Sequence, residues 1–318
     1  VHGPELGLSS GYFLTLWRSD SEGSSSIEQN SRHPLDLEYS IGFDLAPDSV
    51  APNLSDGAGN NGAAAVWVRQ NGSSPVIQGA TSDNEFISGQ VNLSGRLSDQ
   101  PQPKVAIGAQ NVATAVWIGE YLDPKGYTGL HPDIETVDFT SDGAIGSSPR
   151  GVGFGEHLSQ PAVAANGNST ARAIVWTGGA DGNEIQAALR SPGNVYWSDA
   201  MVLSRSGVNR DPQVVIGDQG QIVVAWVRRD APGKVMVAIS RDGEGFGAPA
   251  AIAARPGQLP SDPKLAIDGC GRYTVVWRES DGAIRGASGT GDPGTPVLLA
   301  ADSAADGGPA IASNPVGK

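Results

Sequence analysis

Ile222-Val-Val-Ala-Trp226 is the clearest example of a short apolar stretch that ends in tryptophan and occurs six times in the 318 residues. The tryptophans that end these stretches are Trp17, Trp67, Trp117, Trp176, Trp226 and Trp277. They follow one another at intervals of 50, 50, 59, 50 and 51 residues, and only Trp197 falls outside the series. A period this regular indicates an array of similar structural units, in which each tryptophan has the same packing role.

Each repeat can be divided into four short β-strands. The first strand opens with a proline, as in Pro212-Gln-Val-Val-Ile216, a position where the missing N–H costs no ladder hydrogen bond. A turn such as Gly217-Asp-Gln-Gly220 leads into the tryptophan strand. That strand is apolar on both alternating faces at residues 63–67 and 222–226, which predicts a sheet covered on both sides. Packed propeller blades provide such cover for sheets connected by short hairpins.

We therefore expect an all-β fold, namely a six-bladed β-propeller of four-stranded antiparallel blades in one domain. The expected repeats are residues 4–51, 52–100, 101–160, 161–211, 212–262 and 263–307. Residues 308–318 are expected to close the ring, because 308–313 repeats the pattern of a first strand and closure hides sheet edges. The stretch at residues 4–8 competes for the same position in the first blade. A seven-bladed ring that lacks most of its last blade is the alternative.

Charge and composition exclude several classes of partner. Acidic residues outnumber basic ones by 34 to 21, a formal net charge of −13, whereas nucleic-acid binding needs clustered lysine and arginine. No run approaches the ~18 apolar residues of a membrane span. The chain begins at Val1, which fits either a processed secreted chain or a shortened one.

The sequence contains no recognisable metal or cofactor motif. The single cysteine, Cys270, excludes internal disulfides and lies in a predicted tight turn. The four histidines do not have the spacing of a transition-metal site, and the Asn- and Asp-rich segments lack the alternating ligand pattern of calcium loops. We therefore expect no metal and no cofactor, and we find no Ser-His-Asp or paired-carboxylate signature.

The pattern at residues 211–238, Asp-Pro-Gln-Val-Val-Ile followed by Gly-Gln-Ile-Val-Val-Ala-Trp and Val-Met-Val-Ala, resembles repeats of bacterial secreted or cell-surface β-propeller proteins. These are loosely described as sialidase-like or Asp-box-like, and the resemblance implies an extracellular or cell-surface location. Ser240-Arg-Asp-Gly-Glu-Gly-Phe246 comes close to an Asp-box, but its glycines stand one position to either side of the required place. No Arg-Ile-Pro motif of the sialidases is present. The resemblance therefore implies a retained propeller without the sialidase chemistry.

Arginines follow the tryptophan by one or two residues in four repeats and form the first part of a candidate ligand-binding set. They are Arg18, Arg69, Arg228 and Arg278. Arginine recognises carboxylates and hydroxyl-rich ligands through its planar array of donors. The alternative is that these arginines pair with Asp20, Asp230 and Asp281 at the strand ends, where such ion pairs contribute little to stability.

The third repeat carries an insertion of about nine residues, at residues 119–131, with Tyr121, Tyr127 and His131. Typical connections have ~4–6 residues. Its two tyrosines complete the candidate binding set, because aromatic rings can stack on sugars, although they can equally pack on a neighbouring blade.

These observations favour a non-catalytic propeller that recognises a carbohydrate or another surface ligand, such as a surface protein, through one loop face. A scaffold for protein interactions is the first alternative, and a glycan-active enzyme of the sialidase or lyase kind is the second. The fold alone cannot choose among them, because propellers serve many functions.

Overall fold

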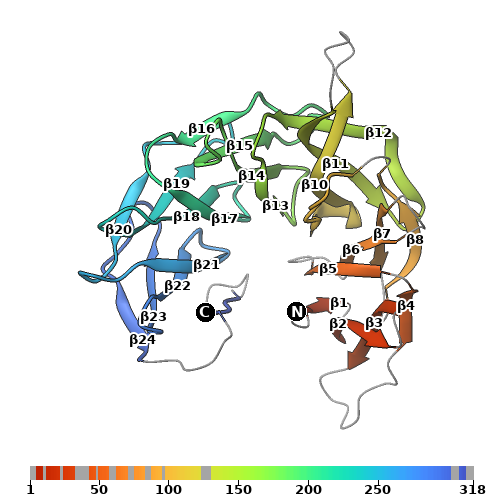
Figure 1. Ribbon diagram of the computed structural model, residues 1–318, viewed down its shortest axis with the longest axis horizontal. Helices are drawn as coiled ribbons and strands as arrows, with labels where there is room; N and C mark the ends of the chain where they lie inside the picture. Colours follow the sequence, from red (N-terminus) through yellow and green to blue (C-terminus); the bar gives the residue numbers. More distant parts are fainter. Residues whose placement is uncertain are drawn as a thin grey trace. The chain divides into compact units, whose positions relative to one another are not determined.

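The computed structural model describes residues 5–9, 12–21, 24–32, 43–47, 49–56, 62–70, 75–82, 87–94, 97–122, 130–301 and 308–312. This part of the chain is all-β apart from one short 3-10 helix, η1 (Ala109–Asn111). The chain divides into two compact units, Val1–Phe154 with Gly167–Ser169 and Gly155–Asn166 with Thr170–Lys318. We call them the N-terminal and C-terminal units, and Figure 1 labels the strands of each.

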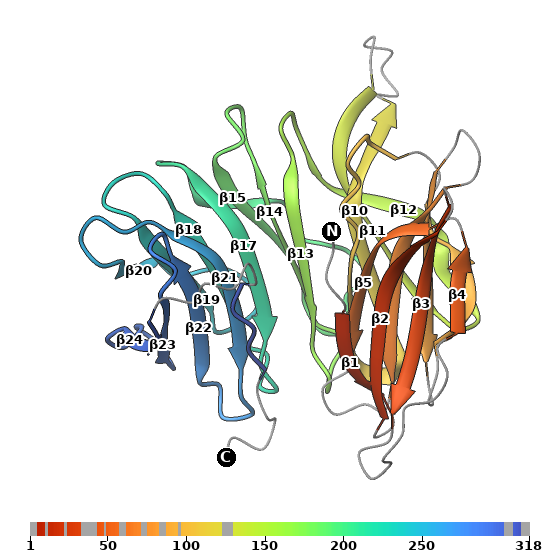
Figure 2. The ribbon, with the colours of Figure 1, turned by 60° about the horizontal axis from the view of Figure 1, so that its bottom comes forward.

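The N-terminal unit contains three four-stranded antiparallel sheets, each built from strands that are consecutive in sequence. The first consists of β1 (Glu5–Ser9), β2 (Tyr12–Ser21), β3 (Ser24–Arg32) and β4 (Phe43–Pro47), side by side in Figure 2. The second consists of β5 (Ser49–Asp56), β6 (Ala63–Arg69), β7 (Val76–Ser82) and β8 (Ser88–Asn92). The third consists of β9 (Lys104–Ile107), β10 (Ala113–Leu122), β11 (Leu130–Thr140) and β12 (Gly143–Phe154).

The C-terminal unit repeats this arrangement three more times. The fourth sheet consists of β13 (Ser159–Ala165), β14 (Arg172–Gly178), β15 (Glu184–Arg190) and β16 (Met201–Ser204). The fifth consists of β17 (Asn209–Ile216), β18 (Ile222–Arg228), β19 (Lys234–Ser240) and β20 (Ala250–Ala253). The sixth consists of β21 (Pro260–Ile267), β22 (Tyr273–Glu279), β23 (Ile284–Gly289) and β24 (Val297–Ala300).

Each of the six tryptophan stretches is the second strand of its sheet, and the apolar layers lie between neighbouring sheets of a unit. Trp67 packs with residues of the first sheet, and Trp117 packs with residues of the second. In the C-terminal unit Trp226 and Trp277 pack toward the preceding sheet in the same way. These four side chains and Trp176 are 0% exposed, whereas Trp17 is partly exposed. The prediction of strands covered on both faces is confirmed for β6, β14 and β18, which are buried over almost their whole length.

The prolines of the first strands lie inside β5, β13, β17 and β21 rather than at their starts. The pairing register with the second strand shifts at each of them, for example between Arg210 and Gln213 across Pro212. The residue before the proline has a left-handed backbone at Gln160, Asp211 and Asp262, with φ of 54°, 57° and 48°. A bulge leaves one residue unpaired, so a proline is tolerated within a strand at this point.

The predicted closing strand at residues 308–313 is not confirmed. Residues 308–312 form no strand, and β1 occupies the place beside β2 in the first sheet. The competing stretch at residues 4–8 therefore supplies that strand. Gly308 instead lies against the Asp262 carboxylate of β21, so close that an added Cβ would overlap it.

Candidate functional site

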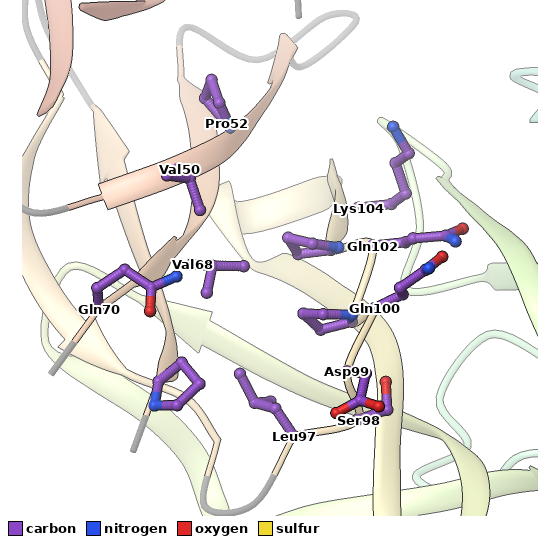
Figure 3. Close-up of a pocket in the computed structure, with 13 residues that line it drawn as sticks. Val50, Pro52, Val68, Gln70, Leu97, Ser98, Asp99, Gln100, Gln102 and Lys104 are labelled. Carbon is purple, nitrogen blue, oxygen red and sulfur yellow. The ribbon is translucent and has the colours of Figure 1, made fainter. Parts of the chain in front are cut away.

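A pocket of about 780 Å³ opens in the N-terminal unit between the second sheet and the segment that precedes and begins β9. In Figure 3 Val50 and Val68 lie on one side, and the segment from Leu97 to Lys104 lies on the other. The apolar lining residues are Val50, Pro52, Val68, Pro75, Leu97, Pro101 and Pro103, and the polar ones are Gln70, Ser98, Asp99, Gln100, Gln102 and Lys104. Its size and mixed lining are those of a small-ligand site.

Hydrogen bonds to β10 hold the segment that lines the pocket. Ser98 Oγ donates to the Ile118 carbonyl at 2.9 Å, and the Ile118 N–H donates to the Pro101 carbonyl at 2.8 Å. Leu97 forms an isolated antiparallel bridge with Gly119. The segment thus continues the edge of the third sheet beyond β9, and its backbone is fixed although it is not a regular strand.

Two acidic side chains, Asp133 and Glu135, lie on one face of β11 close to that edge. Asp133 is 3% exposed, and its Oδ1 has no hydrogen-bond partner. Burial raises the pKa of Asp133 to about 6. Burial and the neighbouring Asp133 charge raise the pKa of Glu135 to about 7, against the opposing effect of the hydrogen bond from Trp117. Carboxyl groups whose pKa is raised in this way are concentrated at functional sites.

Two glycines make room for these carboxyl groups. Gly119 of β10 pairs with Asp133, yet a Cβ added to Gly119 would lie 2.5 Å from Glu135 Cδ. Gly151 of β12 pairs with Glu135, yet its Cβ would lie 2.9 Å from Asp133 Oδ2. Each acidic side chain therefore leans into the row of the other. Glu135 leans toward β10 and Asp133 toward β12, and the Asp133 charge still contributes to the raised pKa of Glu135.

The carboxyl pair is connected to the pocket by one row of residues across the third sheet. Leu97 lies beside Gly119, Gly119 beside Asp133, and Asp133 beside Phe154. Leu97 lines the pocket, and Phe154 is 60% exposed at the other edge of the sheet. The Glu135 carboxyl group lies over Gly119, which is the bridge partner of the pocket-lining Leu97.

Two of the four predicted arginines form the ion pairs that were the alternative to ligand binding. Arg18 Nε lies 2.8 Å from Asp20 Oδ1, and Arg228 Nη2 lies 2.8 Å from Asp230 Oδ2. The hydrogen bond from Arg228 lowers the pKa of Asp230. For these two residues the structure contains the pairing that the sequence suggested.

The other two arginines are partly buried, and the third predicted acidic partner is used elsewhere. Asp281 pairs with Arg255, and Arg278 makes a different polar contact. Arg69 follows its tryptophan by two residues and therefore lies on the same face of its strand as that tryptophan. Arg278 follows its tryptophan by one residue and lies on the opposite face. The same difference separates Arg228 from Arg18. Ligand binding by these four arginines stays a prediction.

The insertion of the third repeat is only partly described. Its first residues extend β10, where the backbone of Tyr121 pairs with that of His131 on β11. The side chain of Tyr121 and the whole of Tyr127 lie outside the described residues. The role expected for these two tyrosines in stacking on a sugar also stays a prediction.

Sequence reasoning missed the pocket and the carboxyl pair. The expected repeat places a third strand after the tryptophan strand, and in the third sheet this strand, β11, carries acidic residues at alternate positions, Asp133 and Glu135. Because alternate residues share a face, this spacing was a usable signal of two carboxyl groups close together. The pocket had no such signal, since its lining comes from segments about 50 residues apart.

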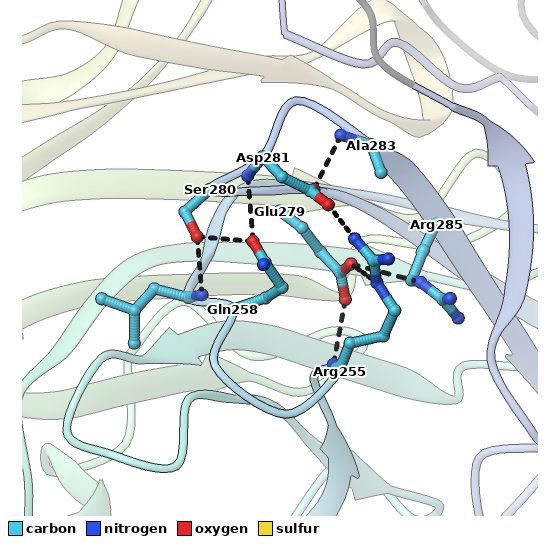
Figure 4. A network of polar contacts seen from close by, with 8 residues as sticks. Arg255, Gln258, Glu279, Ser280, Asp281, Ala283 and Arg285 are labelled. Carbon is cyan, nitrogen blue, oxygen red and sulfur yellow. Dashed lines mark hydrogen bonds and ion pairs between the residues drawn. The ribbon is translucent and has the colours of Figure 1, made fainter.

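A second polar cluster, in the C-terminal unit, ties a loop to β22 (Figure 4). The Arg255 backbone N–H donates to Glu279 Oε1 at 3.1 Å, and Arg255 Nε donates to Glu279 Oε2 at 2.6 Å. Arg285 Nε lies 3.3 Å from the same Oε2. Ser280 Oγ donates to Gln258 Oε1 at 2.8 Å. The buried Glu279 is neutralised by two arginines, so this cluster is structural.

Among the described residues, no three His, Cys, Asp or Glu side chains come together in a way that could hold a metal ion. Within the same part of the chain, no helix has the length and apolar character needed to cross a membrane.

No protein-family model and no curated protein matches the chain. Solved structures do resemble it. An ulvan lyase superposes with a TM-score of 0.55 at 12% identity, over 93% of this chain and 80% of the lyase. A lectin of Aleuria aurantia superposes with 0.51 at 14% identity, over 95% and 96%. The NanB sialidase of Streptococcus pneumoniae superposes with 0.51 at 8% identity, over 86% of this chain and 64% of the sialidase. These similarities show the fold, which is that of β-propeller lectins, sialidases and lyases.

Proposed function

We propose that the chain is an extracellular, non-catalytic β-propeller that recognises carbohydrate, with its six sheets as the six blades. The pocket beside β9 and β10 is its binding site. The fold supports this proposal because propellers of the same kind include a lectin crystallised with a fucoside. At such low identity the choice among propeller functions depends on the site itself.

The chemistry of the pocket lining carries the proposal. A sugar presents hydroxyl groups and also apolar C–H faces. The glutamines around the pocket offer both donors and acceptors, and the Asp99 carboxylate is a strong acceptor. In Figure 3 the side chains of Gln100 and Gln102 extend in the same direction, away from Val50 and Val68, which lie on the opposite side of the pocket. The volume of about 780 Å³ lies within the ~300–1,000 Å³ typical of small-ligand sites.

A glycan array followed by equilibrium binding to the best glycan tests the proposal. We expect Gln70→Ala to weaken binding about tenfold, because the exposed amide of Gln70 lines the pocket. Gln219→Ala is the matched control, since Gln219 is an exposed turn residue in the other unit. If Arg228→Ala and Tyr127→Ala weaken binding while Gln70→Ala does not, the loop-face residues form the site and the pocket does not.

A glycan-active enzyme is the second candidate, and one observation favours it. A general acid needs a pKa near the working pH, and Glu135 has a pKa of about 7. Turnover of a sialoside or a uronic-acid polymer that is lost in Glu135→Gln would establish the enzyme in place of the lectin.

A further inference from the structure

The pocket lining contains one acidic residue, Asp99, and one basic residue, Lys104. Asp99 is an exposed lining residue, and it makes no hydrogen bond or ion pair to any described residue. Lys104, which carries the one positive charge in the lining, already makes a polar or ionic contact of its own. The chain as a whole has a formal charge of −13. A ligand that enters this pocket therefore meets the exposed Asp99 carboxylate, while the one basic residue of the lining, Lys104, is partly buried.

The carboxyl pair adds to this charge from behind the pocket wall. Among the described residues, no ion pair involves Asp133 or Glu135, in contrast to Glu279 with its two arginines. Asp133 Oδ1 is buried without a partner, and Glu135 Oε2 accepts a hydrogen bond from Trp117 Nε1 at 2.7 Å. Charge that is neither solvated nor paired acts over longer distances than surface charge, because little water screens it.

Geometry directs this charge toward the pocket. Gly119 has no side chain to separate the Glu135 carboxyl group from Leu97, and Leu97 is both the bridge partner of Gly119 and part of the lining. The pocket thus has the Asp99 carboxylate on its surface, the Glu135 carboxyl group over the neighbouring Gly119, and Asp133 one strand farther away.

We propose that the pocket selects saccharides that carry a cationic nitrogen, such as amino sugars, over neutral and anionic ones. This inference rests on the proposed function, because it names the class of carbohydrate that the same pocket binds. A cationic nitrogen in the pocket forms an ion pair with Asp99 and is attracted by Asp133 and Glu135. A uronate or sialic acid is repelled by the same groups.

The test compares oligosaccharides of different charge, of which the neutral and the cationic one share a backbone. Calorimetry at pH 8 and low salt measures the Kd of an N-acetylglucosamine oligomer and of its N-trimethylated counterpart, whose quaternary nitrogen keeps its charge at every pH. A galacturonate oligomer provides the anionic arm. We expect the cationic oligomer to bind about tenfold more tightly than the neutral one, with a preference that decreases at high salt. The anionic oligomer is expected to bind most weakly.

Charge-neutralising variants identify the groups responsible. Asp99→Asn and Glu135→Gln should each reduce the preference for the cationic oligomer, measured as the ratio of the neutral to the cationic Kd, about threefold or more. Glu135→Gln is compatible with the fold, since Gln78 and Gln186 occupy the same place in two other sheets and accept the indole N–H there. Asp218→Asn, at an exposed turn of the other unit, is the matched control.

The possible outcomes separate the inference from the proposed function. Equal binding of the neutral and cationic oligomers, with both weakened by Gln70→Ala, overturns the charge selection and leaves carbohydrate recognition in place. If Asp218→Asn reduces the preference for the cationic oligomer as much as Asp99→Asn does, the preference reflects general attraction to an acidic chain. This outcome also overturns charge selection by the pocket. Absence of binding by every oligosaccharide on the array and in solution contradicts both.

Discussion

Trp117 of the third sheet and Trp277 of the sixth occupy the same place in their repeats and have different surroundings. Both are 0% exposed on the second strand, and each faces a residue of the third strand. Trp117 faces Glu135, which accepts its indole hydrogen at 2.7 Å. Trp277 faces Arg285, which is itself a donor, and Trp277 Nε1 has no hydrogen-bond partner.

The two sheets also carry their buried acidic residue at different positions of the repeat. Two residues after Trp117 stands Gly119, and the acid on the neighbouring strand leans over it without a cation. Two residues after Trp277 stands Glu279, which binds Arg255 and Arg285. The same repeat can thus hold a buried acid in a paired, structural form or in an unpaired form. The candidate site therefore depends on two features: within the described part of the chain Glu135 has no arginine partner of the kind that Glu279 has, and Gly119 has no side chain.

The largest expected effect is the loss of Trp117. Trp117→Ala should lower the free energy of unfolding by about 4 kcal/mol, and Trp277→Ala by about 3 kcal/mol. Trp117→Ala also deprives Glu135 of its donor, whereas Trp277→Ala removes a buried donor that had no acceptor. Urea unfolding followed by circular dichroism measures both. A greater loss for Trp277→Ala would contradict the difference drawn between the two sheets.

The next effect concerns Glu279. Glu279→Ala should cost roughly 3 kcal/mol, because it leaves Arg285 partly buried without its carboxylate and releases the loop at Arg255. By contrast, Glu135→Gln should not destabilise the protein at neutral pH. Thermal unfolding of the two variants side by side checks this, and a larger loss for Glu135→Gln would show that its acid is also paired in the folded protein.

A smaller effect is the pH dependence that Glu135 contributes. Its pKa is raised from 4.5 to about 7, so the folded state holds a proton that the unfolded state has already lost. The resulting stabilisation is complete below about pH 4 and is lost as the pH rises to about 7. Glu135→Gln should therefore equal the wild type at pH 4 and exceed it by about 2 kcal/mol at pH 8. Unfolding free energies across this range provide the measurement; parallel curves for the two proteins would refute a raised pKa.

The smallest expected effect concerns the Trp277 indole N–H, which has no hydrogen-bond acceptor among the described residues. Arg285→Gln should place an amide oxygen opposite Trp277, as Gln78 does for Trp67 at 3.1 Å and Gln186 does for Trp176 at 2.9 Å. We expect stability to increase by about 1 kcal/mol, because a buried donor gains its acceptor and Glu279 keeps Arg255. Arg285→Met removes the same cation without supplying an acceptor and is the control. Equal stability of the two variants would mean that the indole N–H is already satisfied.

The repeat pattern predicted the placement of the tryptophans and the order of strands well. The expected first strand at residues 4–8 corresponds to β1 (Glu5–Ser9), while residues 308–312, of almost the same pattern, form no strand. Sequence alone could not choose between them, since both have the same local preference and only one place beside β2 exists. The candidate arginines were sound as residues near strand ends, but Arg18 and Arg228 have partners within two residues of themselves.

By itself, the sequence determined the period of about 50 residues, the apolar second strand of every sheet, and the burial of every repeat tryptophan except Trp17. These features depend on local propensity and on alternation along one strand, which are written in consecutive residues. Only the tertiary structure decided that Leu97, Gly119, Asp133 and Phe154 form one row, that Glu135 leans over Gly119, and that a pocket opens beside them. The physical reason is that the pKa of a carboxyl group and the shape of a cavity depend on what neighbouring strands bring near, and that proximity has no signature within any single strand.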